Sequence, residues 1–296
     1  MEDLSFAELR AFDAAARHGS MSEAARVLGC RQPTISAHIA SLENRYGVEL
    51  FHRRGRRIEL TEFGQLLRDA TQRLVQAEAD AAALLHGARC QYVGRLQIAA
   101  IGPYNITPLL ARFRQAHPQV QVAVSLGDSR RVVDRIGNYE GDIGVVLHVV
   151  DDPRFYSLPY RRQTLVLFAR RGHPLAERES LALADLEGQE FVLREDGSST
   201  RRVFEGALKA AGVNIRASLE MGSREAVREA VAHGLGLGVV ADTAYVPDPR
   251  LVRLPPLRPS LHTHPHLVCL AERRQAPLIA GFLALAGEAG GVPGRA

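Results

Sequence analysis

The stretch CRQPTISAHIASLE, residues 30–43, has the pattern of a helix that packs on one side only. Its apolar residues Ile35, Ile39 and Leu42 recur at helical spacing and therefore form one buried stripe. The other side carries small and polar side chains, which let another molecule approach the helix backbone closely. Pro33 is compatible with the first turn, where its missing N–H has no partner to lose. This stretch predicts a helix whose outer face is a binding surface.

Two shorter helices are expected before it, because Ser5 with Glu8 and Ser20 with Glu23 have capping-box spacing and glycines follow at 19 and 29. The predicted helices are residues 6–17, 21–28 and 32–44. Their shared core is expected to comprise Leu9, Phe12, Ala16, Ala24, Ala25, Leu28, Ile35, Ile39 and Leu42. The last two helices form a helix-turn-helix, whose second helix reads DNA bases in the major groove. The expected base-contacting residues are Gln32, Pro33, Thr34, Ser36 and His38.

The next segment, YGVELFHRRGRRIELT (residues 46–61), alternates like two short strands at 48–51 and 58–60 around a turn at Gly55. Such a hairpin beside a helix-turn-helix is a wing. Its tip carries the basic residues Arg53, Arg54, Arg56 and Arg57. Packing explains four neighbouring guanidinium groups poorly, whereas DNA phosphates or a narrow minor groove explain them well. The alternative is a merely solvated run of charge.

One long helix is predicted for residues 61–86, which contain no proline and a single early glycine. Apolar side chains recur in it at alternating spacings of four and three, as in a helix-pairing seam. The seam comprises Phe63, Leu67, Ala70, Leu74, Ala77, Ala81 and Leu84. A dimer reads two DNA half-sites, so a dimerising helix directly after the DNA-binding head makes functional sense. The alternative is a helix that packs on the later part of its own chain.

The remaining chain alternates apolar strands with helical patterns, which predicts an α/β fold with a parallel sheet. Strands are expected at 96–101, 120–126 and 142–147, with helices at 106–116 and 130–138. A second set follows, with strands at 163–169, 190–193 and around 239 and helices at 200–211 and 224–233. A strand at 267–270 and a helix at 277–286 close the chain.

The composition of the 296 residues, 46% hydrophobic and 24% charged, is typical of a globular protein. The N-terminus lacks the basic and apolar regions of a signal peptide, and no segment is suited to span a bilayer, so we expect a cytoplasmic protein with no membrane partner. Cys30, Cys90 and Cys269 are too far apart for a disulfide framework or a metal motif. The net charge of +4 is mild, so any nucleic-acid-binding surface must be local.

The chain resembles the LysR-type transcriptional regulators in a series of motifs with that family's order and spacing. These are FAELRAFDAAARHGSMSEAARVLG, QPTIS, SLE, YGVELF and ELTEFG. The resemblance implies a winged helix-turn-helix at 1–60, a linker and dimerisation helix at 61–90, and an effector-binding domain at 91–296 with two lobes of the periplasmic-binding-protein type. Lobe I would span about 91–161 and 267–296 and lobe II about 162–266, with chain crossings near Arg161 and Ser260. The implied partners are promoter or operator DNA, a small-molecule effector, RNA polymerase and further copies of the chain in a homodimer or homotetramer.

The sequence departs from the family pattern within the recognition helix. Arg31 stands where the family usually has a helix-capping Ser or Thr, and Ala37 and His38 replace the usual Arg-Gln. Ala40 and Ser41 replace a later Arg-Arg. Phosphate contacts that the family makes from this helix are therefore expected to come from the wing arginines.

Ligands of open α/β sheets bind at the carboxyl ends of strands, where helix N-termini present free N–H groups. Three loops have this character, GPYN (102–105), EDGSSTR (195–201) and MGSRE (221–225), and they favour an anion such as a carboxylate, sulfate or phosphonate. The candidate effector contacts are Gly102, Pro103, Tyr104, Asn105, Ser198, Ser199, Thr200, Arg201, Ser223 and Arg224. The alternative at each loop is ordinary helix capping.

A finer resemblance connects GPYNITPLL, FHRRGRR and GSREAVREAV to the LysR-type regulators associated with aminoethylphosphonate catabolism. It implies a zwitterionic effector, 2-aminoethylphosphonate or a related phosphonate. The hydroxyl-rich loop and an arginine would hold the phosphonate, while Asp128 with Ser129 would receive the ammonium. The alternative role of Asp128 is to cap the helix that follows it.

Two other classes of protein fit the sequence less well. A solute-binding or transport protein of the same two-lobed fold needs an export signal and leaves residues 1–60 unexplained. An enzyme is not expected, because the chain has no nucleophile elbow, phosphate-binding loop with its lysine, or zinc-ligand spacing. The alternation of His262, His264 and His266 is broken by Pro265 and has no companion Cys or carboxylate cluster, so we expect neither a metal nor a cofactor there.

Overall fold

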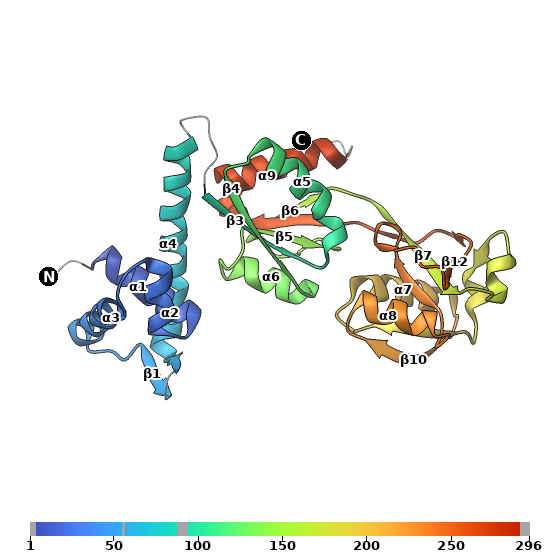
Figure 1. Ribbon diagram of the computed structural model, residues 1–296, viewed down its shortest axis with the longest axis horizontal. Coiled ribbons are helices and arrows are strands. Elements are labelled where there is room, and N and C mark those ends of the chain that lie inside the picture. The colour runs from blue at the N-terminus through green and yellow to red at the C-terminus, as the bar shows by residue number, and fades with distance from the viewer. Residues whose placement is uncertain (1–3, 55–56, 88–93, 291–296) are drawn as a thin grey trace. The chain divides into compact units, whose positions relative to one another are not determined.

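The computed structural model describes residues 4–54, 57–87 and 94–290, and the chain divides into two compact units between Cys90 and Gln91 (Figure 1). No helix within these ranges has both the length and the apolar character needed to cross a membrane. The first unit is built from three short helices, a hairpin and one long helix. Its elements are α1 (Phe6–His18), α2 (Met21–Leu28), α3 (Gln32–Tyr46), β1 (Phe51–Arg54), β2 (Arg57–Leu60) and α4 (Glu62–Gly87).

The three short helices begin where the sequence predicts, and two of them end one or two residues later. The backbone N–H of Ser5 donates to the Glu8 side chain, and Ser20 Oγ accepts from the N–H of Glu23, so both predicted starts carry caps. Gly29 has a φ of +66°, a left-handed conformation that ends α2 and turns the chain into α3. The helices enclose a buried core that includes Leu9, Phe12, Ala24, Ala25, Ile35, Ile39 and Leu42, while Ala16 and Leu28 are partly buried against it.

The wing hairpin begins later than the sequence predicts. β1 starts at Phe51 rather than at residue 48, and it pairs antiparallel with β2 along its whole length. The preceding residues complete the end of α3 instead, because the N–H of Val48 donates to the carbonyl of Glu43 and the N–H of Leu50 donates to the Glu43 side chain. The predicted turn, residues 55–56, lies outside the described residues.

The first turns of α4 are anchored to the rest of this unit. Thr61 precedes the helix and caps it, since its Oγ1 accepts from the N–H of Gly64 at 2.9 Å. A Cβ atom at Gly64 would lie 2.3 Å from the carbonyl oxygen of Leu50, so only glycine permits this backbone approach. Further along, Thr71 and Gln72 are almost fully buried. The start of α4 therefore has a fixed position relative to the three short helices.

The second unit contains two lobes, and lobe I is built on a five-stranded sheet of order β4-β3-β5-β15-β6. Its elements are β3 (Gly94–Ala100), α5 (Thr107–Ala116), β4 (Val120–Leu126), α6 (Ser129–Gly137), β5 (Ile143–Val146), β6 (Phe155–Pro159), β15 (His266–Leu270) and α9 (Pro277–Gly290). α5 and α9 cover one face of the sheet and α6 covers the other (Figure 1). β3 is parallel to β4 and β5, but β15 is antiparallel to β5 and β6, so the sheet is mixed rather than parallel as predicted.

Lobe II surrounds the long strand β7, with α7 packed on one face and α8 on the other. Its elements are β7 (Gln163–Arg170), β8 (Leu181–Ala182), β9 (Glu190–Arg194), α7 (Ser199–Ala211), β10 (Arg216–Met221), α8 (Arg224–Ala232), β11 (Gly238–Ala241), β12 (Leu251–Arg253), β13 (Leu257–Arg258) and β14 (His262–Thr263). β11, β12 and β14 pair antiparallel with β7, whereas β9 with β10 and β8 with β13 are parallel. The predicted parallel arrangement is therefore wrong for β7, because β11, β12 and β14 all run antiparallel to it.

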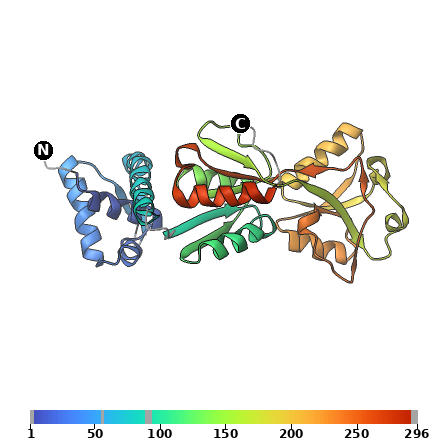
Figure 2. The same ribbon diagram turned by 90° about the horizontal axis from the view of Figure 1, so that it is seen from above.

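The chain passes between the lobes twice, as Figure 2 shows. The first passage leads from β6, which ends at Pro159, to β7, which begins at Gln163. The second follows β14 and is later than the predicted crossing near Ser260, because His262 still pairs with Thr164 of β7. Within the described ranges, no group of three or more His, Cys, Asp or Glu side chains is arranged to hold a metal ion.

Candidate functional site

The outer face of α3 is accessible and polar. Gln32, Pro33 and Thr34 are exposed, and Ser36 and His38 are half-buried, while the apolar stripe of the helix faces the core. The side-chain amide of Gln32 donates to Ser36 Oγ at 3.0 Å. The five residues predicted to contact bases therefore share one surface that presents hydrogen-bond donors and acceptors.

The N-terminal end of α3 has no side-chain cap. Arg31 occupies the N-cap position, and a guanidinium group has no acceptor to offer the amides of the first turn. The first turn also contains no acidic residue. Because a helix N-terminus carries partial positive charge, this end of α3 suits a phosphate oxygen or a base acceptor.

The hairpin brings predicted phosphate-binding arginines together. β1 and β2 place Arg54 opposite Arg57, with Arg53 one position further from the tip. Arg56 lies outside the described residues. The backbone alone thus gathers at least three guanidinium-bearing residues at one end of the hairpin.

The predicted seam of α4 is divided between two environments. Leu67 packs against the core of the short helices. Phe63 and Leu74 expose 48% and 44% of their surfaces. The exposed small residues of the seam are Ala70, Ala77 and Ala81. The apolar strip beyond the anchored turns of α4 is therefore an accessible surface of the kind that marks an interaction site.

In the second unit, the GPYN loop forms a 3₁₀ turn at the end of β3. Asn105 in this loop is buried, and its side-chain oxygen accepts from the amide of Gln163, while its carbonyl accepts from the hydroxyl of Tyr160. Burial raises the pKa of Tyr160 to about 12, so its hydroxyl remains a donor at neutral pH. Asn105 is thus engaged within the protein, whereas Tyr104 is only half-buried.

Three of the predicted effector contacts are helix caps. Asp128, Ser198 and Ser223 occupy the N-cap positions of α6, α7 and α8. Each side chain accepts from the backbone N–H three residues later, at 2.9, 3.4 and 3.1 Å respectively. The capping alternative therefore describes these three side chains, which satisfy helix amides that a ligand would otherwise meet.

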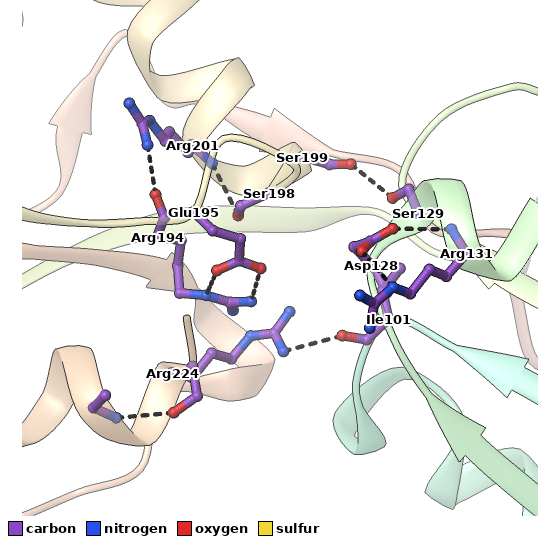
Figure 3. Close-up of polar contacts among 12 residues, drawn as sticks. Ile101, Asp128, Ser129, Arg131, Arg194, Glu195, Ser198, Ser199, Arg201 and Arg224 are labelled. Atoms are coloured by element: carbon purple, nitrogen blue, oxygen red, sulfur yellow. Dashed lines mark hydrogen bonds and ion pairs between the residues drawn. The ribbon is translucent and has the colours of Figure 1, made fainter. Parts of the chain in front are cut away.

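A direct contact between the lobes involves two further predicted residues. Ser129 and Ser199 begin α6 and α7, and their hydroxyl oxygens are 3.1 Å apart (Figure 3). Both serines are nearly fully buried, as is Thr200. The N-termini of the two helices therefore face each other across the space between the lobes.

The two predicted arginines have different surroundings. Arg201 forms ion pairs with Glu205 at 2.9 Å and Glu220 at 2.6 Å, and it also donates to the carbonyl of Arg194. The hydrogen bond to Glu220, followed by that to Glu205, raises the pKa of Arg201 despite its partial burial. Its guanidinium group is therefore already bound within lobe II.

Arg224 instead extends from lobe II towards lobe I, where it donates to the carbonyl oxygen of Ile101 at 3.1 Å (Figure 3). It forms no ion pair with any residue that the structure describes. Burial, and then the charge of Arg194, lowers the pKa of Arg224. A Cβ atom at Gly102 would lie 2.7 Å from the guanidinium nitrogen, so glycine leaves the space that this group occupies. A desolvated cation without an ion-pair partner is a suitable anchor for an anionic ligand.

Two hollows adjoin these residues. The larger has a volume of about 660 Å³ and its lining includes Asp128, Ser129, His148, Asp196 and Arg202. The smaller has a volume of about 30 Å³ and its lining includes Tyr104, Phe168, Arg224, Arg228 and Tyr245. The structure thus places Asp128 and Arg224, the predicted partners of an ammonium and an anion, at different hollows.

His148 and Arg202 were not predicted, although His148 has a signal in the sequence. It directly follows the apolar run that ends β5, and so has the same relation to a strand as the GPYN loop. Burial, and then the charge of Arg202, lowers the pKa of His148. Neutral histidine therefore lines the larger hollow near pH 7.

Comparisons with known proteins cover both units. The LysR substrate binding domain matches residues 91–291, and the bacterial regulatory helix-turn-helix protein, lysR family, matches residues 6–65. The chain is 29% identical over 236 residues to the HTH-type transcriptional regulator CysL of Bacillus subtilis, which covers 79% of each chain.

Solved structures show the same fold. A full-length OxyR variant from Pseudomonas aeruginosa is similar with a TM-score of 0.80 and 20% identity, over 97% of this chain and 94% of that one. Full-length CbnR, in a crystal structure of its complex with target DNA, has a TM-score of 0.68 and 23% identity, over 97% of this chain and all of that one.

Proposed function

Because the chain belongs to the LysR family and is a DNA-binding transcriptional regulator with an effector-binding domain, we propose that α3 is its recognition helix. The observation that carries this assignment is the accessible face of α3, where Gln32, Pro33, Thr34, Ser36 and His38 lie in front of a buried apolar stripe. Such a helix can enter the major groove without uncovering its core. The chain is a regulator and not an enzyme.

In this proposal the wing supplies most of the phosphate contacts. Arg53, Arg54, Arg56 and Arg57 bind the DNA backbone or an adjacent minor groove, and the uncapped N-terminus of α3 adds a further phosphate-binding position. Phosphate contacts set affinity and register, while α3 sets sequence choice. Likewise, the exposed strip on α4 pairs two chains in a homodimer, or in a homotetramer formed from two dimers, so that two heads engage two half-sites. RNA polymerase is the proposed further partner at the promoter.

The proposed effector is a small anion held by Arg224. The hydroxyl groups of Ser129, Ser199 and Thr200 at the facing ends of α6 and α7 provide additional hydrogen-bonding groups. Arg224 already links the lobes through Ile101, so an anion at its guanidinium group acts on the balance between separated and closed lobes. Binding thereby changes the spacing or angle of the two heads on DNA.

A zwitterionic effector such as 2-aminoethylphosphonate is the most specific form of the proposal. Arg224, at the smaller hollow, would hold the phosphonate, and Asp128, at the larger one, would receive the ammonium when the lobes close, with Asp128 also serving as the cap of α6. A thermal-shift series with 2-aminoethylphosphonate, phosphate, sulfate and small dicarboxylates tests this form. Stabilisation by the phosphonate above that by phosphate supports it, and no response to the phosphonate contradicts it.

The DNA-binding proposal is tested by footprinting the full chain on the DNA that flanks its own gene, with and without these candidate effectors. We expect a protected region with two related half-sites, and an altered protection pattern in the presence of the effector. Binding that shows no preference for any promoter fragment over random duplex would contradict the proposal.

A further inference from the structure

Glu8, Ser41 and Arg45 form a polar cluster between α1 and α3, which we call the α1–α3 clamp. The hydroxyl of Ser41 donates to Oε1 of Glu8 at 2.6 Å, and Arg45 donates to the same oxygen at 2.8 Å and to Ser41 Oγ at 2.9 Å. The backbone N–H of Ser5 donates to Oε2 at 3.2 Å. Both carboxylate oxygens are therefore hydrogen-bonded, although only 4% of Glu8 is exposed.

The clamp is directional, whereas the apolar core behind α3 is not. Ser41 and Arg45 lie one helical turn apart on α3, so they present their donors to Glu8 from the same side of the helix. Burial of the apolar stripe opposes separation of α3 from the core, but it depends mainly on buried area and tolerates small rotations and shifts. Charge-assisted hydrogen bonds weaken steeply with poor distance and angle. The clamp therefore fixes the rotation and axial position of α3 relative to α1.

The clamp also gives a physical role to a departure from the family pattern. Ser41 stands where the family usually has arginine, and its hydroxyl is bonded to Glu8 instead of facing a phosphate. This hydrogen bond is the first cause of the lowered pKa of Glu8, and it outweighs the opposing effect of burial. Glu8 is therefore ionised at neutral pH, the state in which it accepts from both Ser41 and Arg45.

We propose that Glu8 is a positioning residue for sequence recognition, which acts through Ser41 and Arg45 to hold the base-reading face of α3 at a fixed angle in the groove. This inference rests on the proposed role of α3 as the recognition helix. Glu8 itself is buried in α1, where it is shielded from a partner at the surface. Its loss should therefore weaken discrimination between sequences, while leaving the phosphate contacts of the wing unchanged.

The test compares Glu8→Gln with Glu23→Gln in the full chain. Both substitutions are isosteric and lie in the same unit, but Glu23 is a surface residue paired with the exposed Arg26. The measurement is the ratio of affinities for the footprinted promoter fragment and for random duplex, together with the salt dependence of each. We expect Glu8→Gln to lower this ratio about tenfold with little change in random binding or salt dependence, and Glu23→Gln to leave the ratio unchanged.

A purely structural role for Glu8 would lower thermal stability and leave the ratio of the folded protein unchanged, and that result overturns the inference. Ser41→Ala and Ser41→Thr provide a milder pair if Glu8→Gln does not fold. Ser41→Ala is expected to lower the ratio, and Ser41→Thr, which keeps the hydroxyl, to restore most of it; equal ratios for the two overturn the inference. Gln32→Ala distinguishes failure of the clamp inference from failure of the proposed recognition role of α3. If Gln32→Ala lowers the ratio and Glu8→Gln does not, the clamp inference fails and the proposed recognition role of α3 stands. If neither variant changes the ratio, the proposed recognition role of α3 fails as well.

Discussion

On α3 the polar side chains of interest remain accessible, whereas in the lobed unit most of them are already bound within the protein. Gln32 and Thr34 are exposed on a helix whose other side forms a core. By contrast, Ser198 and Ser223 cap helices, and Arg201 is held by two glutamates. A surface that binds a large, preformed partner such as a duplex can be recognised from polar residues outside an apolar stripe. A ligand site between lobes cannot, because the same residue types also serve as caps and ion pairs.

The largest expected effect concerns the wing arginines and tests their proposed role in binding DNA phosphates. Replacing Arg53, Arg54, Arg56 and Arg57 with alanine should weaken binding to every duplex by about 10²-fold or more at 0.15 M salt. The log–log salt dependence should become shallower by roughly 0.9 for each phosphate that the variant no longer neutralises. Titration of promoter and random duplexes at several salt concentrations measures both quantities. Loss of promoter binding with random binding intact would contradict a role in binding phosphates.

The next effect separates the two arginines of the lobed unit. Arg224→Met should weaken effector binding about 10-fold to 100-fold, because it removes a charge-assisted hydrogen bond from a desolvated position. Arg201→Met is the matched control, since Arg201 is engaged by Glu205 and Glu220. It should cost some stability and leave effector affinity nearly unchanged. Calorimetric titration with whichever anion gives a thermal shift measures the effector affinity of both variants. A larger loss of affinity in Arg201→Met than in Arg224→Met would contradict the assignment of Arg224 as the anchor.

A smaller effect is expected on the reading face of α3. Gln32→Ala or Ser36→Ala should relax the preference for one base pair in each half-site by about 1–3 kcal/mol. Affinity for random duplex should change much less, since neither side chain is charged. A set of promoter fragments with single base-pair changes, titrated at one salt concentration, measures this. If the affinity for all fragments falls by the same factor, Gln32 and Ser36 do not contribute to base recognition.

The smallest effect compares two buried acids of α1 that have opposite environments. The hydrogen bond from Ser41 lowers the pKa of Glu8, whereas burial raises the pKa of Asp13 above its ordinary value of 3.8 against the effect of Arg17. One carboxylate oxygen of Asp13 is buried without a hydrogen-bond partner. Because its folded-state pKa is raised, the contribution of Asp13 to stability is present below 3.8 and is lost as the pH rises through the folded-state value.

Asp13→Asn should remove this loss, so the stability of the variant relative to the wild type should increase between pH 3.8 and pH 7. Glu8→Gln should show the opposite pH dependence: the ionised Glu8 stabilises above pH 4.5, so its replacement costs more at pH 7 than in acid. Hydrogen exchange of the α1 amides in the full chain, corrected for intrinsic exchange, measures both. Parallel pH profiles for the two variants would contradict the contrast between these acids.

Much of the head is predictable from local signals. Serine–glutamate spacing and the glycines at 19 and 29 set the helix boundaries, and the apolar stripe of α3 determines which face is open. The start of β1 is not predictable in this way, because residues before Phe51 bond to Glu43 at the end of α3. β10 was not predicted either, although Ala217, Leu219 and Met221 alternate with polar residues, because this edge strand is short and its residues are largely exposed.

The candidate effector site cannot be identified from the sequence alone, because it depends on contacts between distant parts of the chain. The sequence places both Arg201 and Arg224 in the first turn of a helix. Acids on β10 and α7 engage Arg201, whereas Arg224 extends to the opposite lobe. The direction of β15 relative to β5 is likewise set by the return of the chain from lobe II. Residue type and spacing therefore predict candidates, and only the folded chain determines which of them remain available.

The backbone contact at Gly64 has a mechanical consequence. α4 contains 26 residues and is therefore about 39 Å long, and the contact at Gly64 fixes it near its N-terminal end. A tilt of about 10° at that joint moves the opposite end by about 7 Å, which is roughly two base-pair steps along a duplex. A side chain at residue 64 would push α4 away from the carbonyl oxygen of Leu50 and so change the angle of the helix. In the proposed dimer, Gly64 therefore sets the angle of α4 relative to the three short helices, and with it the spacing of the two DNA-binding heads.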